Sequence, residues 1–272
     1  MNEIISIRPI IFIVILTTLL LLQIIIPSRK MDKKRIKFMI SNTLIVITNN
    51  FLILLLPLIP LQMAMIAKTK SFGILNIIGN YLLEIPLFNV IFIILGIVIL
   101  DIVIYFQHRL FHQVDFLWKI HSMHHIDPLL DVTSGLRFHP IEIFISNIIK
   151  VSAVFIIGIS PLSVLIFEVG LNSLAMFNHS NIKISPTIEK YLNKILITPA
   201  LHTIHHSKIL KETNSNYGFS VPWWDKLFHT FTPQGKYKQE EIRIGIVPMP
   251  KEEYQLMPKM LIQPFVKTDK ND

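Results

Sequence analysis

The hydrophobic pattern of this 272-residue chain consists of long uncharged runs rather than alternating apolar and polar positions. Residues 9–27 carry no charge, which is long enough for a helix to cross about 30 Å of hydrocarbon. A second apolar stretch, residues 38–67, is broken by Pro57 and Pro60, and a third covers residues 87–106. Since strand-like alternation is weak throughout, we predict an all-α fold, an integral membrane bundle of helices.

A cleavable signal peptide is the alternative interpretation of residues 9–27, because Arg8 precedes them. No small-residue cleavage site follows, so we favour an uncleaved anchor. Six basic residues come next: Arg29, Lys30, Lys33, Lys34, Arg35 and Lys37. Cytoplasmic loops collect lysine and arginine, so the first helix is predicted to begin outside and the third to deliver His108 to the cytoplasmic face.

A fourth apolar stretch, residues 141–177, is interrupted at Gly158 and Pro161. Its two arms, each about 17 residues long, are slightly short for full spans and suit a hairpin that dips into the bilayer and returns. His139 precedes this hairpin and His179 follows it. Both histidines should therefore lie on the same cytosolic side.

Composition supports the membrane assignment, since 51% of residues are hydrophobic, 16% are charged and the mean hydropathy is +0.54. The net charge of +8 fits a surface against anionic lipid, and no basic–aromatic motif suggests nucleic acid. The absence of cysteine removes any disulfide argument. We predict transmembrane helices in residues 1–92, a metal-binding domain in residues 93–232, and a peripheral cytosolic tail in residues 233–272.

All eleven histidines lie between His108 and His229. Eight form three clusters: His108 and His112; His121, His124 and His125; His202, His205 and His206. Helical positions i, i+3 and i+4 share one face, so each cluster should aim its imidazoles at one point. The HxxHH pattern occurs twice, although this composition gives roughly 0.02 chance occurrences of any one such pattern. The clusters predict a metal site.

Two metals are favoured, because one ion takes only four to six ligands. Imidazole suits iron, zinc, copper and nickel, and no thiolate is present to favour a structural zinc or iron–sulfur site. A zincin protease is disfavoured because Arg109 stands where HExxH has its glutamate. Bis-histidine heme would need single histidines on facing helices.

Asp101, Tyr105, His108 and His112 are spaced by four, three and four residues, which places them on one stripe of the third apolar helix. An acid at the end of an apolar helix suggests function, and Asp101 could orient a ligand histidine. The alternative is an interfacial Asp–Arg pair. For Tyr105 and Tyr217, packing with a hydrogen-bonded hydroxyl is at least as good an interpretation as a position near the metals.

Several ordered motifs resemble the fatty acid hydroxylase and sterol desaturase superfamily of membrane di-iron enzymes. The resemblance covers roughly residues 93–232. It rests on Asp101-x3-Tyr105-x2-His108-Arg109-x2-His112, Leu117-Trp118-x2-His121-x2-His124-His125, Arg137-Phe138-His139-Pro140-x-Glu142, Asn178-His179-x-Asn181, Leu201-His202-x2-His205-His206, Asn216-Tyr217-Gly218 and Trp224-Asp225-x-Leu227-Phe228-x-Thr230. The short loop from His112 to His121 and the RFHP form are similar to a bacterial sterol-desaturase-like branch.

The resemblance implies two irons at the cytosolic surface that use O2 to oxidise a lipid from the bilayer. By motif match, the ligands are His108, His112, His121, His124, His125, His179, His202, His205 and His206, with His139 as a tenth. The alternative for His139 is a helix-start histidine hydrogen-bonded to backbone before Pro140. His229 stands where the family commonly has glycine, and we expect a surface residue.

Outer contacts to the ligands are expected from Asp101, Tyr105, Asn178, Asn181 and Asp225, although an asparagine at a helix end is often only a cap. Three tryptophans are interpreted as interfacial anchors, namely Trp118, Trp223 and Trp224. No His-Pro-Gly-Gly signature of a fused cytochrome b5 domain is present. Electrons are therefore expected from a separate cytochrome b5-, ferredoxin- or reductase-type donor.

Two functions from different classes remain. The first is an O2-dependent di-iron oxidoreductase that hydroxylates or desaturates a membrane lipid, or cleaves an alkyl ether, with sterol, fatty acyl, carotenoid and ether lipid substrates all open. The second is a zinc-binding membrane protein with a structural or sensor role. Excess of ligands argues against the second, because a structural zinc site needs four. Zinc could still be the metal found in the purified protein.

Overall fold

The computed structural model describes residues 2–82 and 85–266, which form twelve α-helices and four short 3-10 helices but no strand. Only two isolated bridges occur there, Pro27 to Ile182 and Ser207 to Ile244. The predicted all-α class is confirmed. The α-helices are α1 (Asn2–Ile25), α2 (Arg35–Leu54), α3 (Pro60–Thr69), α4 (Ile74–Leu82), α5 (Pro86–Gln113), α6 (Asp115–His125), α7 (Pro140–Ile157), α8 (Pro161–His179), α9 (Pro186–Leu192), α10 (Pro199–His205), α11 (Leu210–Thr213) and α12 (Trp223–Leu227).

Five of these helices, α1, α2, α5, α7 and α8, are long and apolar enough to cross a membrane. Their outer surfaces carry large apolar side chains, such as Ile24 on α1 and Leu87 on α5, which are 71% and 65% exposed. Lipid tails would cover such side chains, whereas water would be an unfavourable neighbour. The chain is therefore an integral membrane protein.

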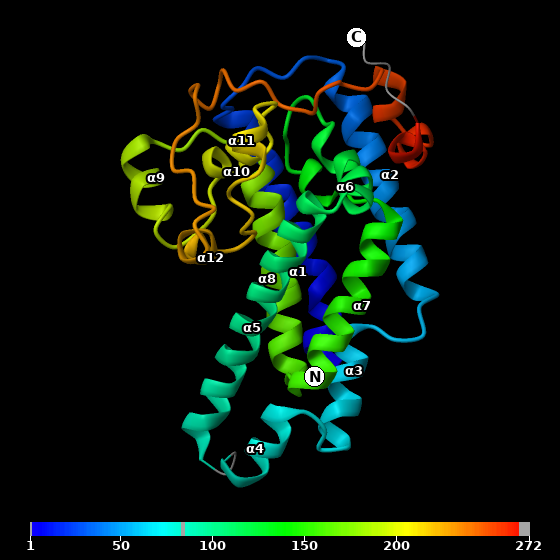
Figure 1. The fold of residues 1–272 in the computed structure, drawn as a ribbon, viewed down its shortest axis with the longest axis vertical. Helices are drawn as coiled ribbons and strands as arrows, with labels where there is room; N and C mark the ends of the chain where they lie inside the picture. Colours follow the sequence, from blue (N-terminus) through cyan, green and yellow to red (C-terminus); the bar gives the residue numbers. More distant parts are fainter. Residues whose placement is uncertain (1, 83–84, 267–272) are drawn as a thin grey trace.

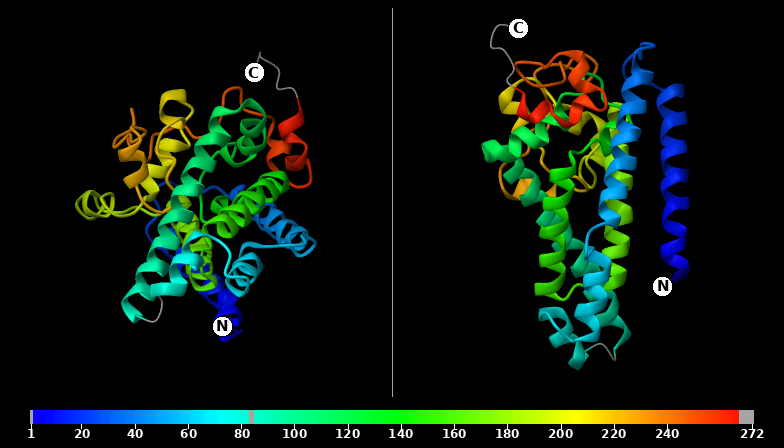
Figure 2. Two further views of the ribbon diagram at one scale, coloured as in Figure 1. Left: turned by 60° about the horizontal axis from the view of Figure 1, so that its bottom comes forward. Right: turned by 90° about the vertical axis from the view of Figure 1, so that its right-hand side faces the viewer.

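The long helices form a bundle with different structures at its two ends. Figure 1 shows α5, α7 and α8 running along the long axis, with α3 and α4 at one end and α6, α10 and α11 at the other. Figure 2 shows the same separation from two further directions. We call the end with α6, α10 and α11 the cap end and the end with α3 and α4 the far end.

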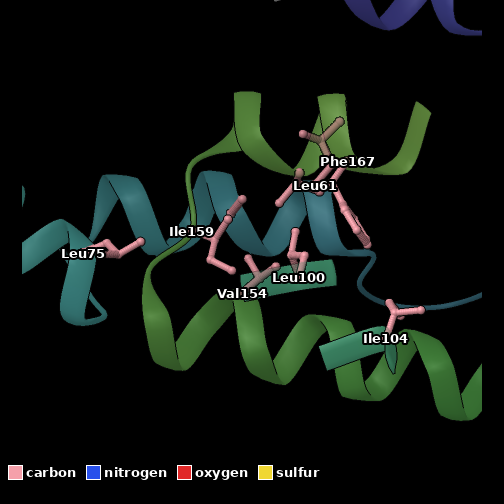
Figure 3. Packing of buried hydrophobic residues seen from close by; sticks show 9 residues of the cluster. Leu61, Leu75, Leu100, Ile104, Val154, Ile159 and Phe167 are labelled. Carbon is pink, nitrogen blue, oxygen red and sulfur yellow. The ribbon is translucent and has the colours of Figure 1, made fainter. Parts of the chain in front are cut away.

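Apolar packing joins α3, α4, α5, α7 and α8 toward the far end. Figure 3 shows this core, in which Leu100 of α5 and Val154 of α7 are fully buried. Gly73 lies against Gly158, the residue that ends α7 in a left-handed conformation with φ +78°. A Cβ on Gly73 would lie 2.4 Å from the Gly158 nitrogen, so the two turns touch through backbone alone.

The fourth apolar stretch forms α7, of 18 residues, and α8, of 19 residues, with a break at the glycine and proline that predicted it. Ser160 caps α8 by accepting a hydrogen bond from the Ser163 N–H. Each arm is long enough to cross a bilayer, whereas the sequence suggested a shallower hairpin. His139 before α7 and His179 at the end of α8 both lie toward the cap end (Figure 1).

The basic segment after α1 also lies at the cap end, and its residues make different kinds of contact. Arg29 donates a hydrogen bond to the Gln239 carbonyl, and Lys37 pairs with Glu252. Arg35 is only 3% exposed and forms ion pairs with Asp127 and Asp131. One of the six basic residues is therefore an internal structural cation rather than a surface charge.

The C-terminal segment packs more tightly than the predicted peripheral tail. It contains η2 (Glu252–Gln255), η3 (Lys259–Leu261) and η4 (Gln263–Phe265), and η1 (Ser134–Leu136) lies earlier in the chain. Met260 is fully buried against Ile45 of α2 and Met123 of α6. The tail thus helps to hold the cap on the bundle. Residues 267–272 of the predicted tail lie outside the described residues.

Candidate metal centre

Nine buried or half-buried histidines converge at the cap end in two adjoining groups. The first histidine group contains His108, His112, His121, His125 and His205, and the second contains His124, His179, His202 and His206. Within each group, one ligand nitrogen from every ring lies within 4.8 Å of the others. The groups touch where the ring of His125 stacks on that of His206, with centroids 4.2 Å apart. They are the nine histidines for which the resemblance implied a ligand role.

Each HxxHH triplet divides its side chains between the two groups, contrary to the expectation that it aims at one point. His121 and His125 of α6 point to the first group and His124 to the second. The reason is helical geometry: at 100° per residue, positions i and i+4 differ by about 40°, whereas i+3 lies about 60° away on the other side. The α10 triplet is the reverse, because His205 alone enters the first group. Each triplet therefore links both groups.

Hydrogen bonds on the outer sides of the rings fix which nitrogen faces the centre. The Nδ1–H of His108 donates a hydrogen bond to the Tyr217 carbonyl at 2.7 Å, and that of His205 donates to the Ser215 carbonyl at 2.7 Å. The Nδ1–H of His124 donates to the Arg137 carbonyl at 3.2 Å. With Nδ1 protonated, each neutral ring keeps its Nε2 lone pair for the centre. Nε2 of His108 lies 3.1 Å from Nε2 of both His121 and His205.

The buried histidines are suited to metal binding rather than to self-contained packing. His112 and His125 each have two buried ring nitrogens without a hydrogen-bond partner, so the nitrogen that each ring turns toward the first group is unpaired. Each such atom costs about 1–3 kcal/mol unless something binds it. Burial, together with the neighbouring imidazoles, holds the pKa of His124, His125 and His206 well below the ordinary value. A cationic metal binds neutral, unpartnered nitrogens, so these histidines fit a metal centre.

Glu142 is a functional residue that the sequence interpretation did not select. Its Oε1 accepts the Nδ1–H of His121 at 2.8 Å, although the two residues lie on α7 and α6. A carboxylate behind a ligand histidine orients the ring and increases its basicity. The signal was an acid in the first turn of an apolar helix, within the motif Arg137-Phe138-His139-Pro140-x-Glu142.

Asp101 does not orient a histidine and forms no ion pair with an arginine. Its Oδ2 accepts a hydrogen bond from the Trp224 indole N–H at 2.7 Å, which joins α5 to α12. Trp224 is therefore tied into the protein rather than standing as a simple interfacial anchor. Trp223 is 50% exposed and donates to the Lys194 carbonyl.

A short hydrogen-bonded relay connects Tyr105 to the first histidine group. Tyr105 Oη lies 2.7 Å from Thr230 Oγ1, and Thr230 donates to Asp225. The Asp225 carboxylate accepts hydrogen bonds from the backbone N–H groups of Tyr217 and Gly218, each at 2.8 Å. Burial raises the pKa of Asp225 to about 6. Asp225 thereby holds the loop whose Tyr217 carbonyl fixes His108, so it positions the ligand indirectly.

The two asparagines that flank His179 differ in their contacts. Asn178 Oδ1 lies 2.6 Å from His179 Nδ1, and it is therefore an outer contact of the second group. Asn181 instead bonds the backbone of Arg29 through both its amide atoms, at 2.8 and 2.9 Å. Trp118 packs on the first group, with its ring centroid 4.8 Å from that of His112.

His139, the expected tenth ligand, lies outside both groups. Its Nδ1 accepts the Ile141 N–H at 3.1 Å and its Nε2 lies 3.0 Å from the Leu261 carbonyl. It is the helix-start histidine of the alternative interpretation, and it also fastens the C-terminal segment. His229 is exposed with φ +56°, a left-handed conformation that explains why glycine suits this position.

A buried ionic network supports the second histidine group from outside. Arg35 pairs with Asp127 and Asp131, and Ser134 donates to Asp127 at 2.8 Å. Burial alone would raise the pKa of Asp127, but the adjacent Arg35 guanidinium outweighs it and lowers the value to about 2. Arg137, fully buried beside this network, donates from Nε to the Met123 carbonyl at 2.9 Å and offers its own carbonyl to His124. The network therefore fixes a ligand through backbone.

A cavity of about 570 Å³ extends from the first histidine group into the bundle. His108 and Gln107 line it at the cap end, and side chains of α1, α2, α7 and α8 line the remainder. Phe12 and Ile143 are among its apolar walls. The cavity therefore connects the metal-binding nitrogens with the interior of the membrane-spanning bundle.

Comparison with known proteins places this arrangement in a family. The model of the fatty acid hydroxylase family matches residues 93–230, which contain all nine converging histidines. The chain belongs to the fatty acid hydroxylase family. This family match begins within α5 and ends just after α12. No significant match to a solved structure was found.

Curated relatives match about half of the chain. Ornithine lipid hydroxylase OlsE of Rhizobium tropici is 34% identical over 51% of this chain and 41% of its own length. Alkylglycerol monooxygenase of Xenopus tropicalis is 30% identical over 52% and 30%, and sphinganine C4-monooxygenase 1 of Arabidopsis thaliana is 28% identical over 54% and 56%. The chain thus spans between 30% and 56% of these relatives.

Proposed function

We propose that this protein is a membrane-bound di-iron oxidoreductase that uses O2 and external electrons to hydroxylate or desaturate a lipid. The observation that carries the proposal is the pair of histidine groups at the mouth of an intramembrane cavity, with His108 belonging to both features. A lipid chain in the cavity would meet the centre without passing through water. The relatives, whose names describe lipid hydroxylases and monooxygenases, support this class of reaction.

The nine histidines would hold the two irons, five residues at one and four at the other. When bound, the irons supply the activation of O2 that an unactivated C–H bond requires. An all-nitrogen ligand set leaves the ions cationic and suited to oxygen-derived ligands. The protein contributes fixed rings, through Glu142, Asn178 and the backbone carbonyls, and a cavity with largely apolar walls.

The cytoplasm is the proposed location of the cap. Arg29 and Lys37 lie at the cap end together with the histidine groups, and basic residues favour the cytoplasmic side. A soluble electron donor of the cytochrome b5, ferredoxin or reductase type would then reach the centre from the cytosol. A reporter fused after Lys33 should report cytoplasm, and an external signal would reverse the proposed orientation.

Metal analysis of the purified protein tests the proposal. Mass spectrometry should find about two irons per chain, and Mössbauer or magnetic measurements should find them spin-coupled when oxidised. Lipids from the host membrane should gain a hydroxyl group or a double bond only when iron, O2 and a reductant are all supplied. One tightly held zinc that resists anaerobic replacement by iron would instead support a structural or sensor protein.

A further inference from the structure

Three charged side chains from three membrane-spanning helices meet at the wall of the cavity. Arg8 Nη2 of α1 lies 2.8 Å from Glu168 Oε2 of α8, and Lys150 Nζ of α7 lies 3.5 Å from Glu168 Oε1. We call these three residues the charged trio. All three line the same cavity as His108. Charges within membrane spans are expensive and mark functional positions by default.

The charged trio is not electrically balanced. Two cations share one carboxylate, which leaves one net positive charge. Glu142 also lines the cavity, but its carboxylate already accepts the His121 N–H. It precedes Lys150 by eight residues on α7, roughly 12 Å along the helix axis, so it does not neutralise the trio. An interior positive charge without a counter-ion is unfavourable in a low-dielectric bundle. Among the residues whose side chains the structure describes, the trio therefore lacks a second anion.

The trio is also accessible from the cavity. Side-chain exposure is 27% for Arg8, 19% for Lys150 and 13% for Glu168. These residues keep donor surface on a cavity wall, where an anionic group can reach it. The guanidinium and ammonium groups have more N–H donors than one carboxylate can accept.

The trio lies deep in the bundle, far from the histidine groups. Glu168 precedes His179 by eleven residues on α8, which corresponds to roughly 16 Å along the helix axis. Between these two points the cavity wall includes apolar residues such as Ile104 and Leu171. The cavity thus has a cationic end, an apolar middle and a metal-binding end.

We propose that the charged trio binds the anionic group, a carboxylate or a phosphate, of a long-chain lipid substrate. The alkyl chain extends from there along the apolar wall toward His108. Oxidation would then occur well along the chain rather than beside the anionic group. That the bound lipid is a substrate rests on the proposed function, whereas its binding to the trio does not require the metals.

Direct binding to the metal-free full-length protein in neutral detergent tests the inference. The probes are hexadecanoate, hexadecyl phosphate and the uncharged hexadecanol, compared by calorimetry. At least one of the anionic probes should bind about tenfold more tightly than hexadecanol, because it gains a charge-assisted hydrogen bond. The anionic probe that binds more tightly identifies the preferred group as a carboxylate or a phosphate. Equal binding of all three would overturn the inference.

Substitutions separate ligand binding from helix packing. Arg8→Gln and Lys150→Gln should each weaken anion binding by about tenfold and leave hexadecanol unchanged. Glu168→Gln removes the competing carboxylate and should strengthen anion binding, although it breaks the same ion pairs. The matched control is Lys190→Gln on exposed α9. If all three variants instead weakened the binding of every probe, hexadecanol included, the trio would be structural only.

These outcomes are distinguishable from a failure of the proposed function. Because the assay uses no iron, O2 or reductant, a protein that holds zinc would still bind the anionic probes through the trio. Conversely, a di-iron enzyme whose variants bind all probes equally would retain its proposed activity and lose only this inference.

Discussion

His121 Nδ1 lies 2.8 Å from the carboxylate of Glu142, which makes Glu142 the acid that orients a ligand of the first histidine group. Backbone carbonyls orient the rings of His108, His124 and His205, so the contact with Glu142 is distinct in its charge. The pair joins α6, in the cap, to the first turn of α7, in the bundle. Cap and membrane-spanning helices are thereby coupled at the centre itself.

Glu142→Gln should weaken metal binding by about 10–100-fold, the usual cost of losing an outer-shell partner. The amide oxygen keeps an acceptor for the His121 N–H but removes the negative charge. Competition with a calibrated chelator measures the affinity. Glu241→Gln, at an exposed position of the C-terminal segment, is the control. Equal affinities in the two variants would show that Glu142 does not tune the ligand.

His205→Ala and His124→Ala should each lower the metal content from about two ions per chain to about one, because they belong to different groups. Activity should be lost in both. His229→Ala should keep the wild-type metal content, since His229 is exposed and lies outside the groups. Equal metal loss in all three variants would contradict this division into ligands and a bystander.

Gly135→Ala should disturb the second histidine group. A Cβ at this position would lie 2.3 Å from the Ala175 carbonyl oxygen and 3.1 Å from His179 Nδ1. The end of α8 must shift, and we expect weaker metal binding and a lower midpoint of thermal unfolding.

Gly170→Ala, on α8, is the matched control, because nothing lies within 4 Å of its added Cβ. It should bind metal normally and gain about 0.5–1 kcal/mol in stability, since alanine favours a helix. Normal metal affinity in Gly135→Ala would mean that α8 adapts to the extra methyl group.

The metal-free protein should lose stability as the pH falls below about 6.5. Burial depresses the pKa of the cap histidines, to about 3 for His205, whereas in the unfolded chain they titrate near 6.5. Below that pH the unfolded state binds more protons, so the free energy of unfolding decreases progressively toward pH 3.

Thermal unfolding of chelator-treated protein across pH 4–8 checks this expectation. The variant His229→Ala should follow the same curve, because its side chain is exposed. A stability that is flat between pH 4 and pH 7 would show that the histidine nitrogens are solvated in the metal-free state.

Much of the fold, and the convergence of nine histidines in the candidate site, could be predicted from sequence, because both depend on local periodicity. Prolines and Gly158 mark the breaks between apolar helices, and the spacing of the histidines identifies their shared faces. Long-range partners could not be predicted in this way. Asp101 was expected near a histidine but bonds Trp224, which follows it by 123 residues.

His139 illustrates the same limit. The motif Phe-His-Pro is compatible with a metal ligand and with a helix start, and only the position of the Leu261 carbonyl distinguishes them. Likewise, no local pattern indicates that Arg35 folds inward to Asp127 while neighbouring basic residues reach the surface. These outcomes depend on which segments meet in three dimensions.

Carbonyl groups, rather than side chains, hold the outer nitrogens of several ligand rings. The residues that supply these carbonyls include Tyr217, Ser215 and Arg137. A carbonyl is present whatever side chain its residue carries, so a substitution at Tyr217 or Ser215 keeps the acceptor, provided that the backbone path is kept. The orientation of these rings therefore depends on the path of the backbone through residues 137 and 215–217 rather than on the identity of an acceptor side chain.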